Sequence, residues 1–321
     1  MLPALATLVV VSIVGVVSVS SSNFTNIEMV SSPSLFSPFL GQLQSTNRVL
    51  AIMVATYFVV ASSFSLGQLA SRYKLYERAY FIQLPLSAIL SWGVAQSSEY
   101  LLSSVIIFVM VRFVGSLFRA VRSDVSVAPI FDASLWLSLL PLLYAPAVLL
   151  WIIMPIFLLT ISITSREWII SFVGLLVAPL VALYVSWLRG GEFGDIAIDY
   201  WSQLRSNSHL MSIERIPLLE LSMIAISLLL SVIGMFIATF SECHPRTKVR
   251  LAMLSLMVVI CSASLLLPSS SLISITLMVP ALALLSALSL VRLHGLFVNL
   301  LYLALVVLFF LNTLVPVYIS V

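Results

Sequence analysis

Long apolar stretches recur along the chain, and they limit its fold more narrowly than any other feature. Runs of roughly 17–25 apolar residues have the length that an α-helix needs to cross a bilayer. They lie at residues 4–19, 48–69, 79–95, 99–118, 131–144, 146–163, 168–188, 216–240, 250–267, 271–291 and 296–318. We therefore expect an all-α polytopic transmembrane bundle of about ten to eleven spans. The number depends on whether the short run 131–144 crosses the bilayer completely.

Composition agrees with a membrane solvent. Hydrophobic residues make up 61% of the chain and charged residues only 8%, whereas soluble domains carry about 25% charged residues. We expect a single integral membrane domain over residues 1–321, surrounded by the lipid bilayer. Cys243, Cys261 and three scattered histidines form no metal-binding motif, so neither a metal site nor a cofactor is predicted.

The basic residues alternate between the two sides of the predicted bundle. With the N-terminus in the cytoplasm, ten basic residues fall on the cytoplasmic side: Arg72, Lys74, Arg78, Arg119, Arg122, Arg166, Arg246, Lys248, Arg250 and Arg292. Four fall on the outer side: Arg48, Arg189, Arg205 and Arg215. This asymmetry follows the positive-inside rule and predicts an outer C-terminus. The net charge of +3 therefore reflects orientation, and no nucleic-acid partner is expected.

Two outer segments, residues 20–47 and 189–215, are long enough to carry a function. In the first, Phe36, Phe39 and Leu40 suit a short helix along the membrane interface. In the second, Tyr200 and Trp201 suit the headgroup layer, where an aromatic ring has an apolar and a wet side.

Arg112 interrupts the apolar run 99–118, and a charge at that depth needs a partner, water or a function. Arg112, Ser116 and Arg119 share one helical face. One interpretation is that Arg112 extends toward the inner headgroups or pairs with Asp132. The other is that Arg112 and Arg119 together bind a lipid phosphate, which suits guanidinium geometry.

The outer segments also hold the candidates for catalysis. Glu28, Asp195 and Asp199 are weak candidates for a general base or metal ligand, and solvated surface acids are the competing interpretation. Arg205 and Arg215 are candidate outer phosphate contacts. Only Glu220 lies clearly inside an apolar run, close to its outer end. A transporter therefore remains a minor alternative, because coupled transport usually needs acids near the midplane.

Residues 130–188 contain FDAS, Tyr-Ala-Pro at 144–146, Arg-Glu-Trp at 166–168 and a span ending near Pro179. This Arg-Glu-Trp hairpin region resembles a family of uncharacterised bacterial multi-pass inner-membrane proteins. The resemblance implies a bacterial cytoplasmic membrane location, with protein partners in that membrane or the periplasm.

The same region and the stretch 265–288 bear a fainter resemblance to the GT-C class of polyprenol-dependent glycosyltransferases. That resemblance implies a transferase acting on a polyprenyl-phosphate-linked donor, with Glu28 foremost and a divalent metal as cofactor. Our first hypothesis is instead a non-catalytic subunit or scaffold of an envelope assembly, or a protein that binds a polyprenyl lipid or phospholipid. The transferase is the alternative.

Overall fold

A computed structural model describes most of the chain. It describes residues 2–21, 37–76, 81–94, 99–121, 127–161, 165–188, 190, 198, 200–202, 204–205, 218–240, 245–267, 270–271, 273–292 and 296–319. Within those residues the regular elements are all helices. The predicted all-α bundle is thereby confirmed.

Long helices form the frame of the molecule. They are α1 (Leu2–Ser21), α3 (Arg48–Arg72), α5 (Tyr100–Ala120), α8 (Ser165–Leu188), α10 (Leu218–Phe240), α11 (Pro245–Ser264) and α14 (Leu296–Ile319). Shorter elements are α2 (Ser37–Thr46), α4 (Gln83–Val94), α6 (Val127–Leu143), the 3-10 helix η1 (Ala145–Ile152), α7 (Ile153–Ile161), α12 (Ile273–Thr276) and α13 (Val279–Arg292). Among the described residues, six helices are long and apolar enough to cross a membrane: α1, α3, α5, α8, α10 and α11. The protein is therefore a multi-pass membrane protein.

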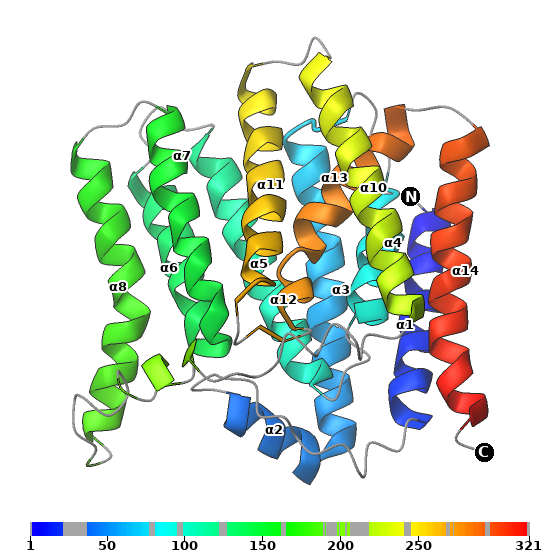
Figure 1. Cartoon of the computed structure of the whole chain (residues 1–321), viewed down its shortest axis with the longest axis horizontal. Helices are drawn as coiled ribbons and strands as arrows, with labels where there is room; N and C mark the ends of the chain where they lie inside the picture. The colour runs from blue at the N-terminus through cyan, green and yellow to red at the C-terminus, as the bar shows by residue number, and fades with distance from the viewer. Residues whose placement is uncertain are drawn as a thin grey trace.

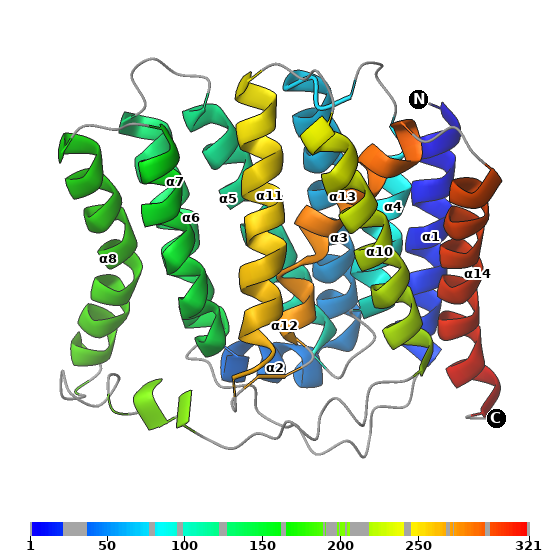
Figure 2. The same ribbon diagram turned by 45° about the horizontal axis from the view of Figure 1, so that its top comes forward.

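The helices run side by side, with α8 at one edge and α1 and α14 at the other (Figure 1). Helix α2 lies across the lower ends of the bundle (Figure 2). It corresponds to the predicted interfacial helix, and its Phe39 side chain is exposed. Contacts at the opposite end join the C-terminal ends of α3 and α5 to the start of α11: the Arg250 guanidinium stacks on Tyr73 and Phe118. Successive basic turns therefore gather at one end, as the predicted alternation requires.

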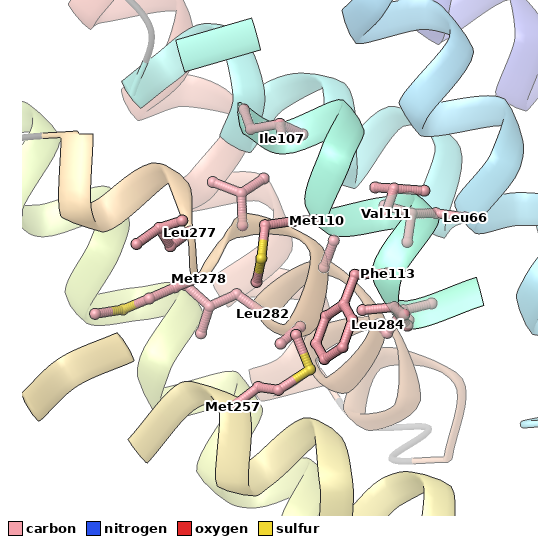
Figure 3. Close-up of a cluster of buried hydrophobic side chains, with 14 of the residues drawn as sticks. Leu66, Ile107, Met110, Val111, Phe113, Met257, Leu277, Met278, Leu282 and Leu284 are labelled. Atoms are coloured by element: carbon pink, nitrogen blue, oxygen red, sulfur yellow. The ribbon is translucent and has the colours of Figure 1, made fainter. Parts of the chain in front are cut away.

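The core centres on α5 and α13, whose side chains are buried almost all round. Leu66 of α3, Met110 and Phe113 of α5, Met257 of α11 and Leu282 of α13 meet there (Figure 3). Helix α8 differs, because it buries only the narrow strip Ser171, Gly174, Leu175 and Ala178. A helix that is apolar all round belongs in a core or against lipid, so the outer face of α8 is suited to the bilayer.

Two predicted spans are interrupted. The run 146–163 begins as the 3-10 helix η1, with Pro146 in its first turn, and the run 271–291 breaks at Leu277 and Met278 between α12 and α13. Neither run is therefore a single continuous α-helix. The run 131–144, which comes before the first of these two, forms a longer helix than predicted. Helix α6 covers 17 residues, or about 25 Å at the α-helical rise.

Tyr144 connects the two interruptions. It is fully buried between α6 and η1, and its hydroxyl shares a 2.6 Å hydrogen bond with the Ser274 hydroxyl of α12. The backbone N–H of Ser271 donates to the same oxygen at 2.8 Å. Backbone groups freed by a helix break must find partners inside the protein when no water is present. The Tyr144 hydroxyl is such a partner for the Ser271 N–H.

Candidate functional site

The strongest candidate site is a basic pocket between α3, α5 and α6, with a volume of about 220 Å³. Three arginines line it, together with Ser65, Gln68, Leu69, Tyr73, Val111, Gly115, Ser116 and Trp136. The arginines are Arg72 from the last turn of α3 and Arg112 and Arg119 from α5. We call this site the arginine pocket. It lies at the end of the bundle where the basic turns gather.

Helical spacing on α5 brings the predicted pair together. Arg112, Ser116 and Arg119 all line the arginine pocket, and the Arg119 guanidinium donates to the Ser116 hydroxyl at 2.9 Å. The predicted shared face is confirmed. Gly115 lies opposite the Leu69 side chain of α3, where an added Cβ would be 3.4 Å from Leu69 Cδ2. This is an ordinary van der Waals distance, so the packing of α3 on α5 does not require glycine at this position.

Arg112 is held by aromatic rings. Its guanidinium carbon lies 5.4 Å from the centroid of the Phe108 ring and 5.9 Å from that of the Trp136 ring. Cation–π contacts of this kind stabilise a guanidinium outside bulk water. The two rings orient Arg112 within the arginine pocket.

The predicted pairing of Arg112 with Asp132 was wrong. Asp132 lies 3.3 Å from a guanidinium nitrogen of Arg119 instead, and both side chains are about half exposed, at 44% and 47%. Trp136, one turn farther along α6, occupies the level of Arg112. Asp132 therefore lies beside Arg119, at the edge of the arginine pocket. Arg112 is seven residues earlier on α5, or about 10 Å farther along the helix axis.

Positive charge dominates the arginine pocket. Among the described residues, its lining contributes three guanidinium groups and no carboxylate, and Asp132 at its edge offsets only one of them. Gln68, Ser65 and Ser116 add neutral hydrogen-bonding groups. Such a set matches a phosphate oxygen cluster, because guanidinium groups bind phosphate through paired, charge-assisted hydrogen bonds.

An apolar groove adjoins the arginine pocket on the other side of α3. Its volume is about 400 Å³, and it is lined by Phe64, Gly67, Gln68, Ser71, Arg72, Phe81 and Leu84. Gln68 and Arg72 line both cavities. We call it the α3–α4 groove. Neither Arg72 nor this groove was among the predicted site residues, because the sequence marks Arg72 only as one of the basic residues that indicate orientation.

The outer candidates lie elsewhere. Arg205 stacks on the Trp201 ring at 5.2 Å, and the neighbouring Tyr200 hydroxyl donates to the Ala145 carbonyl at 2.9 Å. Burial raises the pKa of Tyr200 above its usual range, so this hydroxyl stays neutral. Because Ala145 follows the far end of α6, Arg205 is remote from the arginine pocket.

The remaining predicted residues, Glu28, Asp195, Asp199 and Arg215, lie outside the described residues. The transferase hypothesis rests on them and stays a prediction. Among the residues that the structure describes, no group of three or more potential metal ligands is present.

Glu220 is more buried than its shallow position suggested, with 8% of its surface exposed. Its carboxyl is hydrogen-bonded to the Asn312 side chain of α14. The Asn312 amide in turn donates to the Gly93 carbonyl near the end of α4, at 3.2 Å. These contacts join α10, α14 and α4, and they give Glu220 a structural role at the end of the bundle away from the arginine pocket.

Compared with protein-family models, with curated proteins and with solved structures, the chain matches none. Function must therefore be inferred from the geometry of the chain itself.

Proposed function

We propose that this integral membrane protein binds the phosphate headgroup of an anionic lipid in the arginine pocket. The observation that carries the proposal is the gathering of Arg72, Arg112 and Arg119 around one cavity whose described lining residues include no acid. Charged side chains within membrane spans are costly and need compensation. A lipid phosphate supplies that compensation from within the bilayer.

The depth of the arginine pocket favours a lipid over a soluble anion. Arg112 lies inside the span α5, seven residues before Arg119, which places it about 10 Å farther into the bundle. A lipid phosphate lies in the headgroup layer, within reach of Arg119 and of an Arg112 side chain extended toward that layer. A soluble anion must instead leave bulk water to enter the pocket. The positive-inside pattern predicts that the site faces the cytoplasmic leaflet.

The same lining favours binding over chemistry. In the part of the chain that the structure describes, it holds no carboxylate, histidine or cysteine, and the nearby Asp132 is engaged by Arg119. General acid–base catalysis needs a titratable group within hydrogen-bonding reach of the substrate. Tyr73 is the only such candidate besides the arginines among the described lining residues, and its ring packs against the Arg72 and Arg250 guanidinium groups. We therefore favour a lipid-binding subunit of a bacterial inner-membrane assembly, in which the bound lipid stabilises the packing of α3, α5 and α6.

Lipid enrichment around the purified protein tests this proposal. The full chain is reconstituted in phosphatidylcholine nanodiscs with a minor fraction of phosphatidic acid, and bound lipids are counted by native mass spectrometry. We expect wild type to retain phosphatidic acid preferentially. The double variant Arg112→Gln/Arg119→Gln is expected to lose at least about tenfold in preference, because charge-assisted hydrogen bonds contribute roughly 1.5–3 kcal/mol each.

Arg166→Gln is the matched control, because Arg166 is an exposed arginine at the start of α8 and does not line the arginine pocket. It removes one positive charge from the same side of the bundle and should leave the lipid preference unchanged. Equal retention of phosphatidic acid by wild type and the double variant would refute the proposed function.

A further inference from the structure

The α3–α4 groove and the arginine pocket meet along one turn of α3. Gln68 and Arg72, four residues apart on that helix, line both cavities. Residues four apart on a helix lie on the same face, one above the other. A ligand that contacts these two side chains therefore has access to both cavities without leaving the protein surface.

The two cavities differ sharply in chemistry. The arginine pocket presents three guanidinium groups, whereas the α3–α4 groove presents the hydrocarbon surfaces of Phe64, Phe81 and Leu84. Phe64 is 42% exposed, so the groove is open at that side chain. An anionic site beside an open apolar groove is complementary to an amphiphile with one phosphate and at least one hydrocarbon chain.

The course of α3 sets the direction of such a ligand. Phe64 precedes Arg72 by eight residues, which places it about 12 Å deeper along the helix axis. The groove therefore extends from the level of the arginines toward the bilayer interior, as a lipid chain does. Gly67 lies along this path, and its missing side chain lets Leu84 pack close to α3, since an added Cβ would come within 3.2 Å of Leu84 Cδ2.

We propose that one phospholipid occupies both cavities, with its phosphate in the arginine pocket and one hydrocarbon chain crossing α3 beside Gln68 and Arg72 into the α3–α4 groove. This inference rests on the proposed phosphate-binding function and adds the position of the chain. Binding in both cavities makes the protein selective for phosphates that carry a long hydrocarbon chain. Neither free phosphate nor a short-chain analogue can fill both cavities.

The test compares three probes on the purified full chain in detergent: long-chain phosphatidic acid, short-chain phosphatidic acid and inorganic phosphate. The measured quantity is the ratio of the dissociation constants of the short-chain and long-chain lipids. Micelles also take up the long chain, but that effect is the same for every variant. Wild type should bind the long-chain lipid most tightly and inorganic phosphate most weakly.

Ser71→Trp fills the groove from an exposed position at its edge. We expect the ratio to fall about tenfold, equivalent to losing the burial of roughly two methylene groups. Ala252→Trp is the control, because Ala252 is exposed on α11, a helix that contributes nothing to either cavity. It should keep the wild-type ratio. If Ser71→Trp does not fold, Phe64→Asn places a polar group in the groove and carries the same expectation.

The outcomes separate this inference from the proposed function. If Arg112→Gln/Arg119→Gln weakens binding of both lipids but the groove variant keeps the ratio, the chain lies elsewhere and only this inference fails. If the double arginine variant binds both lipids as wild type does, the proposed function fails and this inference with it. Inorganic phosphate binding as tightly as the long-chain lipid would overturn the selectivity claimed here.

Discussion

Asp132 is the residue that competes most directly with a ligand in the arginine pocket. Its carboxylate lies 3.3 Å from Arg119, and an incoming phosphate must share or replace that contact. We predict that Asp132→Asn strengthens phosphatidic acid binding by up to about fivefold, because an exposed ion pair contributes 0.2–1 kcal/mol. Lipid titrations monitored by native mass spectrometry measure the change. Weaker binding would mean that Asp132 orients Arg119 for the ligand and does not compete with it.

Single residues in this bundle were predicted where the helical repeat determines their position. Arg112, Ser116 and Arg119 share a face because they are four and three residues apart on one helix. That spacing can be seen in the sequence alone. The ion pair of Asp132 with Arg119 did not follow, because it depends on where α6 begins relative to α5. The role of Arg72 likewise depends on which helices are neighbours, and one sequence does not show that.

At the scale of helices, close packing of α10 on α13 depends on small residues. The Ser231 and Ser286 hydroxyls lie 3.1 Å apart, and Ser289 donates to the Leu230 carbonyl. An added Cβ on Gly234 would collide with the Leu285 carbonyl oxygen and lie 2.8 Å from the Ser289 hydroxyl. Small residues and serines at helix contacts are how membrane helices approach closely.

Gly234→Ala should therefore lower the free energy of unfolding by about 1–3 kcal/mol, because overpacking outweighs the better helix propensity of alanine. Gly115→Ala is the matched control, since its added Cβ meets Leu69 only at ordinary contact distance, 3.4 Å. Denaturant unfolding in detergent measures both variants. The packing described for α10 and α13 is incorrect if the two substitutions have the same effect.

The interrupted helices make a second prediction at this scale. Removing the Tyr144 hydroxyl with Tyr144→Phe leaves the Ser271 N–H and the Ser274 hydroxyl without that partner. We expect a loss of about 1–3 kcal/mol in stability, the cost of leaving buried polar groups unsatisfied. Hydrogen exchange should rise first around residues 271–279. Unchanged exchange there would show that Tyr144 does not hold the α12–α13 break.

The helix breaks were beyond prediction from the apolar pattern. Leu277 and Met278 form the break before α13, and neither residue type signals an interruption. Pro280 follows in the first turn of α13. Proline occurs in the first turn of a helix as well as at kinks inside one, so Pro280 alone does not predict a break. By contrast, α3, α5 and α8 begin and end within a few residues of their predicted runs, because long uniform apolar stretches define spans well.

At the scale of the whole molecule, the alternation of basic turns predicts which ends face the cytoplasm. Cysteines introduced at Arg166 and Lys248, in a background with Cys243 and Cys261 replaced by serine, should react with a membrane-impermeant thiol reagent only after cells are opened. A cysteine replacing Trp201 should react in intact cells. Labelling of Arg166→Cys and Lys248→Cys from opposite sides would contradict both the orientation and the arrangement of the bundle.

The central claim is that a lipid phosphate lies among Arg72, Arg112 and Arg119. A density map of the wild-type protein in nanodiscs containing phosphatidic acid tests it most directly. We expect headgroup density within hydrogen-bonding distance of Arg112 and Arg119, continuous with chain density between Phe64 and Leu84. An arginine pocket filled by protein side chains, or holding only water while lipid density lies elsewhere, would contradict it.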